Sequence, residues 1–173
     1  SVVCADEIKL VAGSAYTGDS IVAMSSNFQD ALSISSFAYK YKVPIFLQTQ
    51  WENRSLPQEA IERIGAADGA IYVPGGPGAV TEASVEGVFG EDRVVRIYGE
   101  DGYDTSNQIA HYMVDNGFLK PDVVVVACGA QGAKGSDALA GAALAGRSGG
   151  VILLVNGNTA LESQHFETIE GRD

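Results

Sequence analysis

Five short apolar runs place the tightest limit on how this chain can fold. Each run is rich in β-branched residues and almost continuously apolar, instead of alternating with polar residues. The runs are residues 20–25, 43–49, 70–74, 123–128 and 151–155, with weaker candidates at 8–12 and 94–98. Continuous apolar runs are typical of strands that are buried on both faces. The sequence therefore predicts parallel sheets covered by helices.

Segments with the apolar spacing of helices separate these runs. They are residues 30–41, 58–64, 82–89, 107–116 and 137–147. Asp30, Ser55, Thr81 and Asp137 are the expected N-caps of the first, second, third and fifth segments, and Gly117 is expected to end the fourth. The regular alternation of strand and helix predicts an α/β fold with right-handed crossovers.

The chain contains an internal duplication. Asp-Ala-Leu occurs at 30–32 and again at 137–139, 107 positions further on. Without a gap, residues 30–47 then align with 137–154, and Lys40 falls opposite Arg147. We interpret this as two tandem repeats, 1–93 with an atypical amino-terminal part and 94–173, incomplete at its carboxyl end. The alternative is two similar Ala-rich crossovers in one unrelated sheet.

The chain contains four short motifs, two of which occur twice. They are R-I-Y-G-E-D-G-Y-D-T at 96–105, Asp-Ala-Leu at 30–32 and 137–139, the apolar strands 44–47 and 151–154, and a strand followed by Gly-Gly within 71–80. These motifs and their order resemble those of the cell wall binding repeat, type 2. The resemblance covers most of the chain, and four weak motifs in register are together fairly specific.

This resemblance implies Rossmann-like or toprim-like parallel α/β repeats in tandem. It also implies a secreted, non-catalytic module that holds S-layer and other surface proteins non-covalently on anionic polysaccharides of a Gram-positive cell wall. Neighbouring repeats of the same protein would be its other partners.

The sequence departs from the family pattern at several points. Gly102 stands where the family has Arg, and Val151 stands where it has Pro. The first repeat has only residues 13–17 in the place of the opening motif, with no room for the helix that normally follows.

The charge of the chain limits its partners. It has 11 Lys and Arg against 22 Asp and Glu, a formal net charge of −11. An acidic chain has no general attraction to nucleic acid or to anionic lipid. Its longest apolar runs are also far shorter than the roughly 20 residues that span a bilayer. We therefore expect neither a nucleic-acid partner nor an integral membrane segment.

An acidic module can bind an anionic polymer only through local positive charge. Lys40 and Arg147 occupy equivalent positions at the ends of the two Asp-Ala-Leu helices, where the helix dipole alone also favours cations. Lys42 follows closely, and Arg93 and Arg96 flank the opening of the second repeat. These five residues are the expected polymer-binding set.

Two other functions remain open. Cys128 follows an apolar strand, as the nucleophile does in PfpI-like and class I amidotransferase-like hydrolases, but it would need a partner such as His111 or His165. The repeats could instead be purely structural and pack against further modules. No dinucleotide or P-loop fingerprint and no metal-ligand spacing is present, so no cofactor or metal is expected. The spacing of Cys4 and Cys128 does not settle whether they pair.

Overall fold

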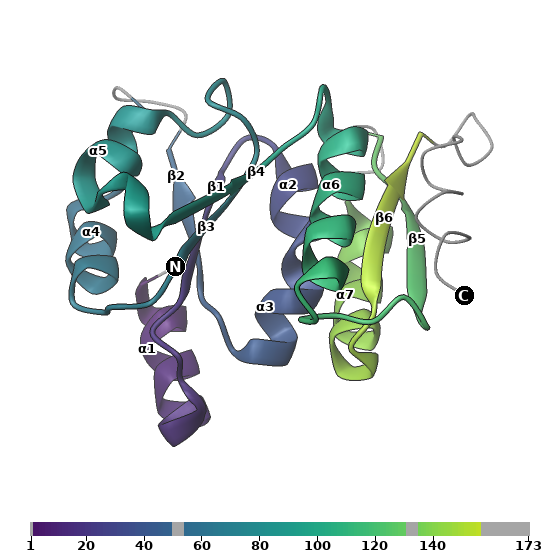
Figure 1. Ribbon diagram of the computed structural model, residues 1–173, viewed down its shortest axis with the longest axis horizontal. Coiled ribbons are helices and arrows are strands. Elements are labelled where there is room, and N and C mark those ends of the chain that lie inside the picture. Colours follow the sequence, from purple (N-terminus) through teal and green to yellow (C-terminus); the bar gives the residue numbers. More distant parts are fainter. Residues whose placement is uncertain (1, 50–53, 131–134, 157–173) are drawn as a thin grey trace.

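The computed structural model describes residues 2–49, 54–130 and 135–156, and its strands form two parallel sheets (Figure 1). The larger sheet contains β1 (Ser20–Met24), β2 (Ile45–Gln48), β3 (Ile71–Pro74) and β4 (Val94–Ile97) in the order β2-β1-β3-β4. The smaller sheet pairs β5 (Val124–Cys128) with β6 (Val151–Val155). All paired strands run parallel, which confirms the fold class predicted from the continuous apolar runs.

Helices connect the strands and cover the sheets. Before β1 lies α1 (Val2–Ala12), and between β1 and β2 lie α2 (Phe28–Ser33) and α3 (Ser35–Tyr41). The remaining helices are α4 (Gln58–Gly65), α5 (Glu86–Phe89), α6 (Gly102–Asp115) and α7 (Ser136–Ser148), with short 3₁₀ turns at Gly13–Ala15, Glu82–Ser84 and Glu91–Arg93. Helices α2, α3 and α6 lie between the two sheets (Figure 1).

The duplication is visible in the strand register. Ile21 pairs with Ile45 in the larger sheet, and Val125 pairs with Ile152 in the smaller one. The unit β1-α2-α3-β2 therefore corresponds to β5-α7-β6. The crossover is one continuous helix in the second repeat, whereas in the first repeat it breaks at Ile34, which separates α2 from α3. Strand β4, which the sequence assigned to the second repeat, extends the sheet of the first.

Residues 8–12, a weak strand candidate, lie instead in α1. The segment belongs to the run 5–12, in which Ala, Glu, Lys and Leu, all good helix formers, outweigh the short apolar stretch. Helix α1 precedes β1 as α6 precedes β5. As predicted, no helix follows residues 13–17, since β1 comes next in the chain. The first repeat does have a helix, α1, before these residues.

Several helix starts differ from the expected N-caps. Asn27 caps α2 through its side-chain oxygen, which accepts a hydrogen bond from the Gln29 N–H, so Asp30 lies inside the helix. Helix α7 starts after Gly135 without a side-chain cap, which places Asp137 inside that helix as well. Pro57 takes the N-cap position of α4 that was assigned to Ser55.

The two remaining predicted helices also differ from the structure at their starts. Asp101 caps α6 by accepting from two backbone N–H groups, so this helix begins five residues earlier than predicted. Thr81 does stand before the first turn of 82–89, yet its side chain makes no cap hydrogen bond, and the segment divides into a 3₁₀ turn and α5. Gly117 ends α6 with a φ of +72°, as predicted.

One apolar core joins the two repeats. It includes Ile21 and Tyr72 from the first sheet, Met113 from α6 and Leu153 from the second sheet. The ring of Phe37 packs edge-on against Tyr72, with ring centres 4.9 Å apart. Because α2 contacts both α6 and β6, the described parts of the two repeats pack against each other and share one core.

Candidate functional site

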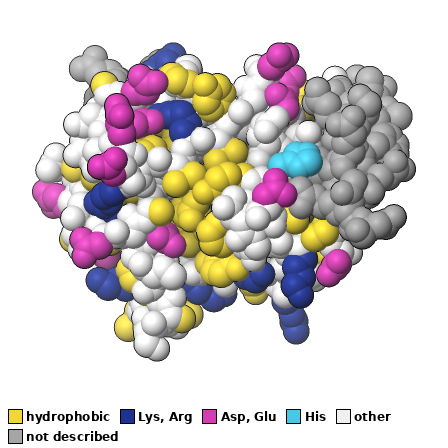
Figure 2. Space-filling view, viewed as in Figure 1, with side chains coloured by type: hydrophobic (Ala, Val, Ile, Leu, Met, Phe, Trp, Pro, Cys, Tyr) yellow, Lys and Arg dark blue, Asp and Glu magenta, His cyan; other side chains and the backbone are white. Residues whose placement is uncertain are grey.

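Four cations gather at one edge of the described structure, where the crossover helices end and the next strands begin. Lys40 lies in the last turn of α3 and Lys42 follows that helix, while Arg147 lies in the last turn of α7. Lys120 stands before β5. We call these four residues the basic edge. Figure 2 shows Lys and Arg side chains along the lower rim of the molecule, the end at which α3 and α7 terminate in Figure 1.

Close packing of α3 on α7 brings the members of the basic edge together. Gly146 allows this approach, because a Cβ atom at that position would lie 2.6 Å from the Cβ of Tyr39. Gly149 then sits between two members of the set. Its carbonyl accepts a hydrogen bond from the Lys120 N–H (2.8 Å), and a Cβ atom on it would lie 3.3 Å from Lys40 Nζ.

The four side chains are held to different degrees. Lys40 Nζ donates to the Phe118 carbonyl (2.7 Å). Lys42 has a φ of +59° and ends α3 in a left-handed conformation, with its Nζ donating to the Tyr39 carbonyl (2.9 Å). Arg147 and Lys120 are exposed, and neither side chain has a hydrogen bond or ion pair within the described residues. Each lysine ammonium carries three donors, so Lys40 and Lys42 keep donors for a ligand.

Arg93 and Arg96, also predicted as ligands, lie away from this edge group and are engaged inside the fold. Arg93 donates to the carbonyls of Ala67 (2.7 Å) and Gly69 (3.0 Å), just after α4. Arg96 makes a bidentate ion pair with Glu86 (2.7 and 2.8 Å). The structure thus brings together three of the five predicted residues, and a ligand role for the two arginines stays a prediction.

Sequence reasoning missed Lys120, although its position held a usable signal. The residue stands four positions before β5, and Arg147 stands four positions before β6. Because neighbouring parallel strands start at the same edge of a sheet, cations placed equally before two paired strands come close together.

The carboxyl ends of the first-sheet strands carry a second polar feature. The Asp30 carboxylate, on α2, lies against Gly75, which directly follows β3 and has a φ of +110°. Burial raises the pKa of Asp30 to about 6. No described group donates a hydrogen bond to this carboxylate. The Gly-Gly turn was expected from the sequence, whereas the buried Asp30 beside it was expected to be a helix cap.

The arrangement around Cys128 does not form a nucleophile–base pair among the described residues. Its thiol is free and half-buried at the end of β5, and Cys4 is free on α1. His111 lies on α6, where it lines a shallow hollow with Tyr98 and Asp115. No hydrogen bond joins Cys128 to His111, and His165 lies outside the described residues. Gly129 and Ala130, the described residues that follow Cys128, are not helical, and α7 begins at Ser136.

The two halves of the chain match one known protein family. The sequence model of cell wall binding domain 2 (CWB2) matches residues 4–86 and 96–170, one match for each repeat. The chain belongs to this family. Membership in the CWB2 family makes it a cell-wall-associated module, as its sequence motifs predicted. Within the described ranges, no helix combines the length and apolar character needed to cross a bilayer.

Solved structures show the same CWB2 fold. Cwp8 from Clostridium difficile aligns over 89% of this chain with a TM-score of 0.71 and 21% identity. Cwp6 from Clostridium difficile aligns over 94% with a TM-score of 0.73 and 20% identity. The chain spans 25% of the length of each of these proteins. Comparison with curated proteins gives no match.

Proposed function

We propose that this chain is a secreted, non-catalytic module that anchors a surface protein non-covalently to an anionic polymer of a Gram-positive cell wall. Membership in the CWB2 family supports the location at the wall. The basic edge supports the proposal that the polymer is anionic, and this part of the proposal depends on one observation. Lys40 and Arg147, equivalent residues of the two repeats, come to the same edge of a chain whose net charge is −11.

Distance limits how strongly the acidic surplus of the chain acts on a bound polymer. At physiological salt, charges are screened beyond about 8 Å, so the acidic surplus elsewhere opposes a bound polymer only weakly. Phosphate or carboxylate groups on the polymer would accept charge-assisted hydrogen bonds from the lysine ammonium groups and the Arg147 guanidinium. Single exposed ion pairs contribute only about 0–1 kcal/mol, so useful affinity requires several polymer charges to engage several cations at once.

Cosedimentation with purified cell walls tests this proposal. The chain should pellet with intact walls and remain in solution when the secondary polymer has been stripped from them. Arg147→Glu should weaken pelleting at least fivefold. Arg54→Glu is the matched control, because it makes the same charge change at an exposed arginine that lies on the loop before α4. Equal pelleting with intact and stripped walls would contradict the proposal.

A second role, packing against a further repeat, is favoured by the contrast between α1 and α6. Helix α6 buries six of its residues, mostly against α2 and β6, whereas α1 buries only Ala5. Leu10 and Val11 on α1 are 76% and 77% exposed. We propose that another repeat covers this face. Adding a neighbouring repeat to the chain should protect the amides of α1 from hydrogen exchange, and unchanged exchange would argue against it.

A further inference from the structure

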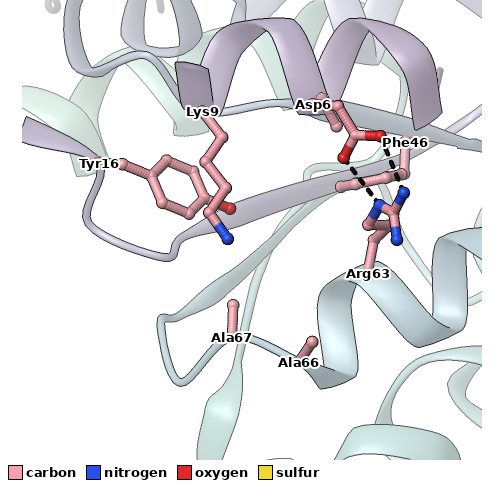
Figure 3. Close-up of a pocket in the computed structure, with 8 residues that line it drawn as sticks. Asp6, Lys9, Tyr16, Phe46, Arg63, Ala66 and Ala67 are labelled. Atoms are coloured by element: carbon pink, nitrogen blue, oxygen red, sulfur yellow. Dashed lines mark hydrogen bonds and ion pairs between the residues drawn. The ribbon is translucent and has the colours of Figure 1, made fainter. Parts of the chain in front are cut away.

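A small polar pocket lies between α1, the turn after it, and α4 (Figure 3). Tyr16 and Lys9 stand on one side, and the Asp6–Arg63 ion pair stands on the other. Phe46, which is buried, contributes to the lining together with Ala5, Ala66 and Ala67. The pocket encloses about 170 Å³, less than the roughly 300–1,000 Å³ of sites that hold drug-sized molecules. It has room for a single ring and not for an oligomer.

Hydrogen-bonding groups without protein partners face this space from both sides. Arg63 uses Nε and Nη2 on the Asp6 carboxylate (both 2.8 Å), and its Nη1 has no partner within the described residues. Lys9 Nζ stands over one face of the Tyr16 ring in a cation–π contact, 5.8 Å from the ring centre, and no described acceptor hydrogen-bonds to it. The Asp6 oxygens retain lone pairs, and the Tyr16 hydroxyl can both donate and accept. The pocket therefore offers donors and acceptors together.

The charges around the pocket oppose a strongly charged ligand of either sign. Lys9 and Arg63 disfavour a cation. An anion would meet the Asp6 carboxylate, which lines the same pocket. Asp19 adds negative charge nearby, since it contributes with burial to raising the pKa of Tyr16. A neutral ligand with several hydroxyl groups satisfies the free donors and acceptors without either conflict.

The aromatic side chain of Tyr16 also suits a neutral ligand with several hydroxyl groups. Tyr16 provides a half-buried ring with a polar tip, which suits a ligand that has one apolar face and a polar rim. A pyranose ring has this character: its C–H groups can stack on an aromatic face while its hydroxyl groups point outward. Fixed polar side chains such as the Arg63–Asp6 pair then orient it through charge-assisted hydrogen bonds.

We propose that the pocket between α1 and α4 binds one neutral sugar ring, stacked on Tyr16 and hydrogen-bonded by Lys9, Arg63 and Asp6. This inference rests on the proposed function in one respect, because a wall polysaccharide would supply the sugar. It uses none of the four residues of the basic edge, so the two proposals can fail separately.

Titration of the whole chain with free sugars, followed by amide NMR, tests the pocket. N-acetylglucosamine and glucose are the probes, and sodium phosphate is titrated separately. We expect at least one of the two sugars to cause saturable shifts at Tyr16, Ala66 and Ala67, with a dissociation constant of about 1–10 mM. Tyr16→Leu should weaken binding at least tenfold, whereas Tyr16→Phe, which keeps the ring, should bind within about threefold of the unchanged protein.

Two further variants separate loss of the site from loss of the fold. Tyr39→Leu changes an exposed tyrosine on α3 and should bind as the unchanged protein does. The double variant Asp6→Asn with Arg63→Gln removes the exposed ion pair without leaving a lone charge, and it should lose binding while keeping a dispersed spectrum. Absence of saturable shifts with both sugars, the same shifts with phosphate alone, or undiminished binding by Tyr16→Leu would each overturn the proposal. In each of these cases, cosedimentation with walls that depends on Arg147 would still support the proposed anchoring function.

Discussion

The Asp30 carboxylate and the backbone of Gly75 are in direct contact. A Cβ atom built on Gly75 would come within 2.7 Å of Asp30 Oδ2. Gly75 also has a φ of +110°, a conformation that L side chains rarely adopt. The contact joins the first turn of α2 to the turn that follows β3, so two elements of the first repeat depend on the absence of a side chain at this position.

Gly75→Ala should therefore destabilise the fold by about 2 kcal/mol or more, from backbone strain and from displacement of Asp30. Gly78→Ala is the matched control in the same turn, because a Cβ atom there meets nothing within 4 Å. Its effect should stay within about 0.5 kcal/mol. Urea denaturation of the two variants measures both values, and equal losses would show that the Asp30 contact and the φ of Gly75 carry no special cost.

The ionisation of Asp30 should make stability depend on pH. Its pKa is about 6 in the folded protein against 3.8 for the free side chain. The folded state thus binds a proton more readily than the unfolded state, and the group's contribution to stability rises as pH falls from about 7 to about 4. At neutral pH, ionised Asp30 costs about 3 kcal/mol at most.

Asp30→Asn should accordingly stabilise the protein at pH 7, and the gain should shrink toward pH 4. The equivalent residue of the second repeat, Asp137, is exposed and provides the control. Asp137→Asn should leave the difference in unfolding free energy between pH 7 and pH 4 unchanged. A gain for Asp30→Asn that was the same at both pH values would contradict the assignment of the effect to ionisation.

Local patterns in the sequence were sufficient to predict the strands and crossovers. The runs 151–155 and 70–74 became β6 and β3 with at most one residue of difference, because continuous apolar character records burial directly. The duplication followed from the recurrence of Asp-Ala-Leu at 30–32 and 137–139 and the ungapped alignment after it. Helix α1 was missed because a five-residue apolar stretch has no distinct period, and a longer window was needed to detect the helix.

Features that depend on contacts between residues far apart in the chain could not be predicted from the sequence. The division into two sheets depends on which strand edges meet, and no local pattern specifies this. The α1–α4 pocket assembles Asp6, Tyr16, Phe46 and Arg63 from four separate segments. The engagement of Arg96 depends on its ion pair with Glu86, ten positions away on α5. An unpaired arginine and a buried ion-paired one look identical in a sequence.

The two bidentate arginine–carboxylate pairs should differ sharply in their effect on stability. The side chains of Arg96 and Glu86 are only 11% and 15% exposed, whereas those of Arg63 and Asp6 are 50% and 49% exposed. Glu86→Gln removes the counter-charge of a largely buried guanidinium, which keeps only its hydrogen bonds to the Gly75 and Val80 carbonyls, and should cost about 3 kcal/mol. Asp6→Asn should leave stability almost unchanged, because solvent screens this exposed pair. Thermal denaturation of the two variants compares them, and similar losses would show that burial of the first pair has no energetic consequence.

Gly102, which departs from the family pattern, is coupled to Gln29 across the interface between the repeats. A Cβ atom on Gly102 would collide with Gln29 Oε1, and Gln29 Nε2 donates to the Gly129 carbonyl (2.5 Å). This hydrogen bond links α2 of the first repeat to the end of β5 in the second. A larger residue at 102 can fit only if Gln29 moves and gives up the bond, which explains why Gly is suited to this position here.

A double-mutant cycle tests this coupling. Gly102→Ala alone should destabilise the protein by about 1–2 kcal/mol, because displacement of Gln29 outweighs the gain of about 1 kcal/mol from replacing Gly with Ala in a helix. Once Gln29→Ala has removed the obstacle, Gly102→Ala should become neutral or stabilising. The coupling free energy between the two substitutions should thus be at least about 1 kcal/mol. Strictly additive effects in urea denaturation would show that Gly102 and Gln29 act independently.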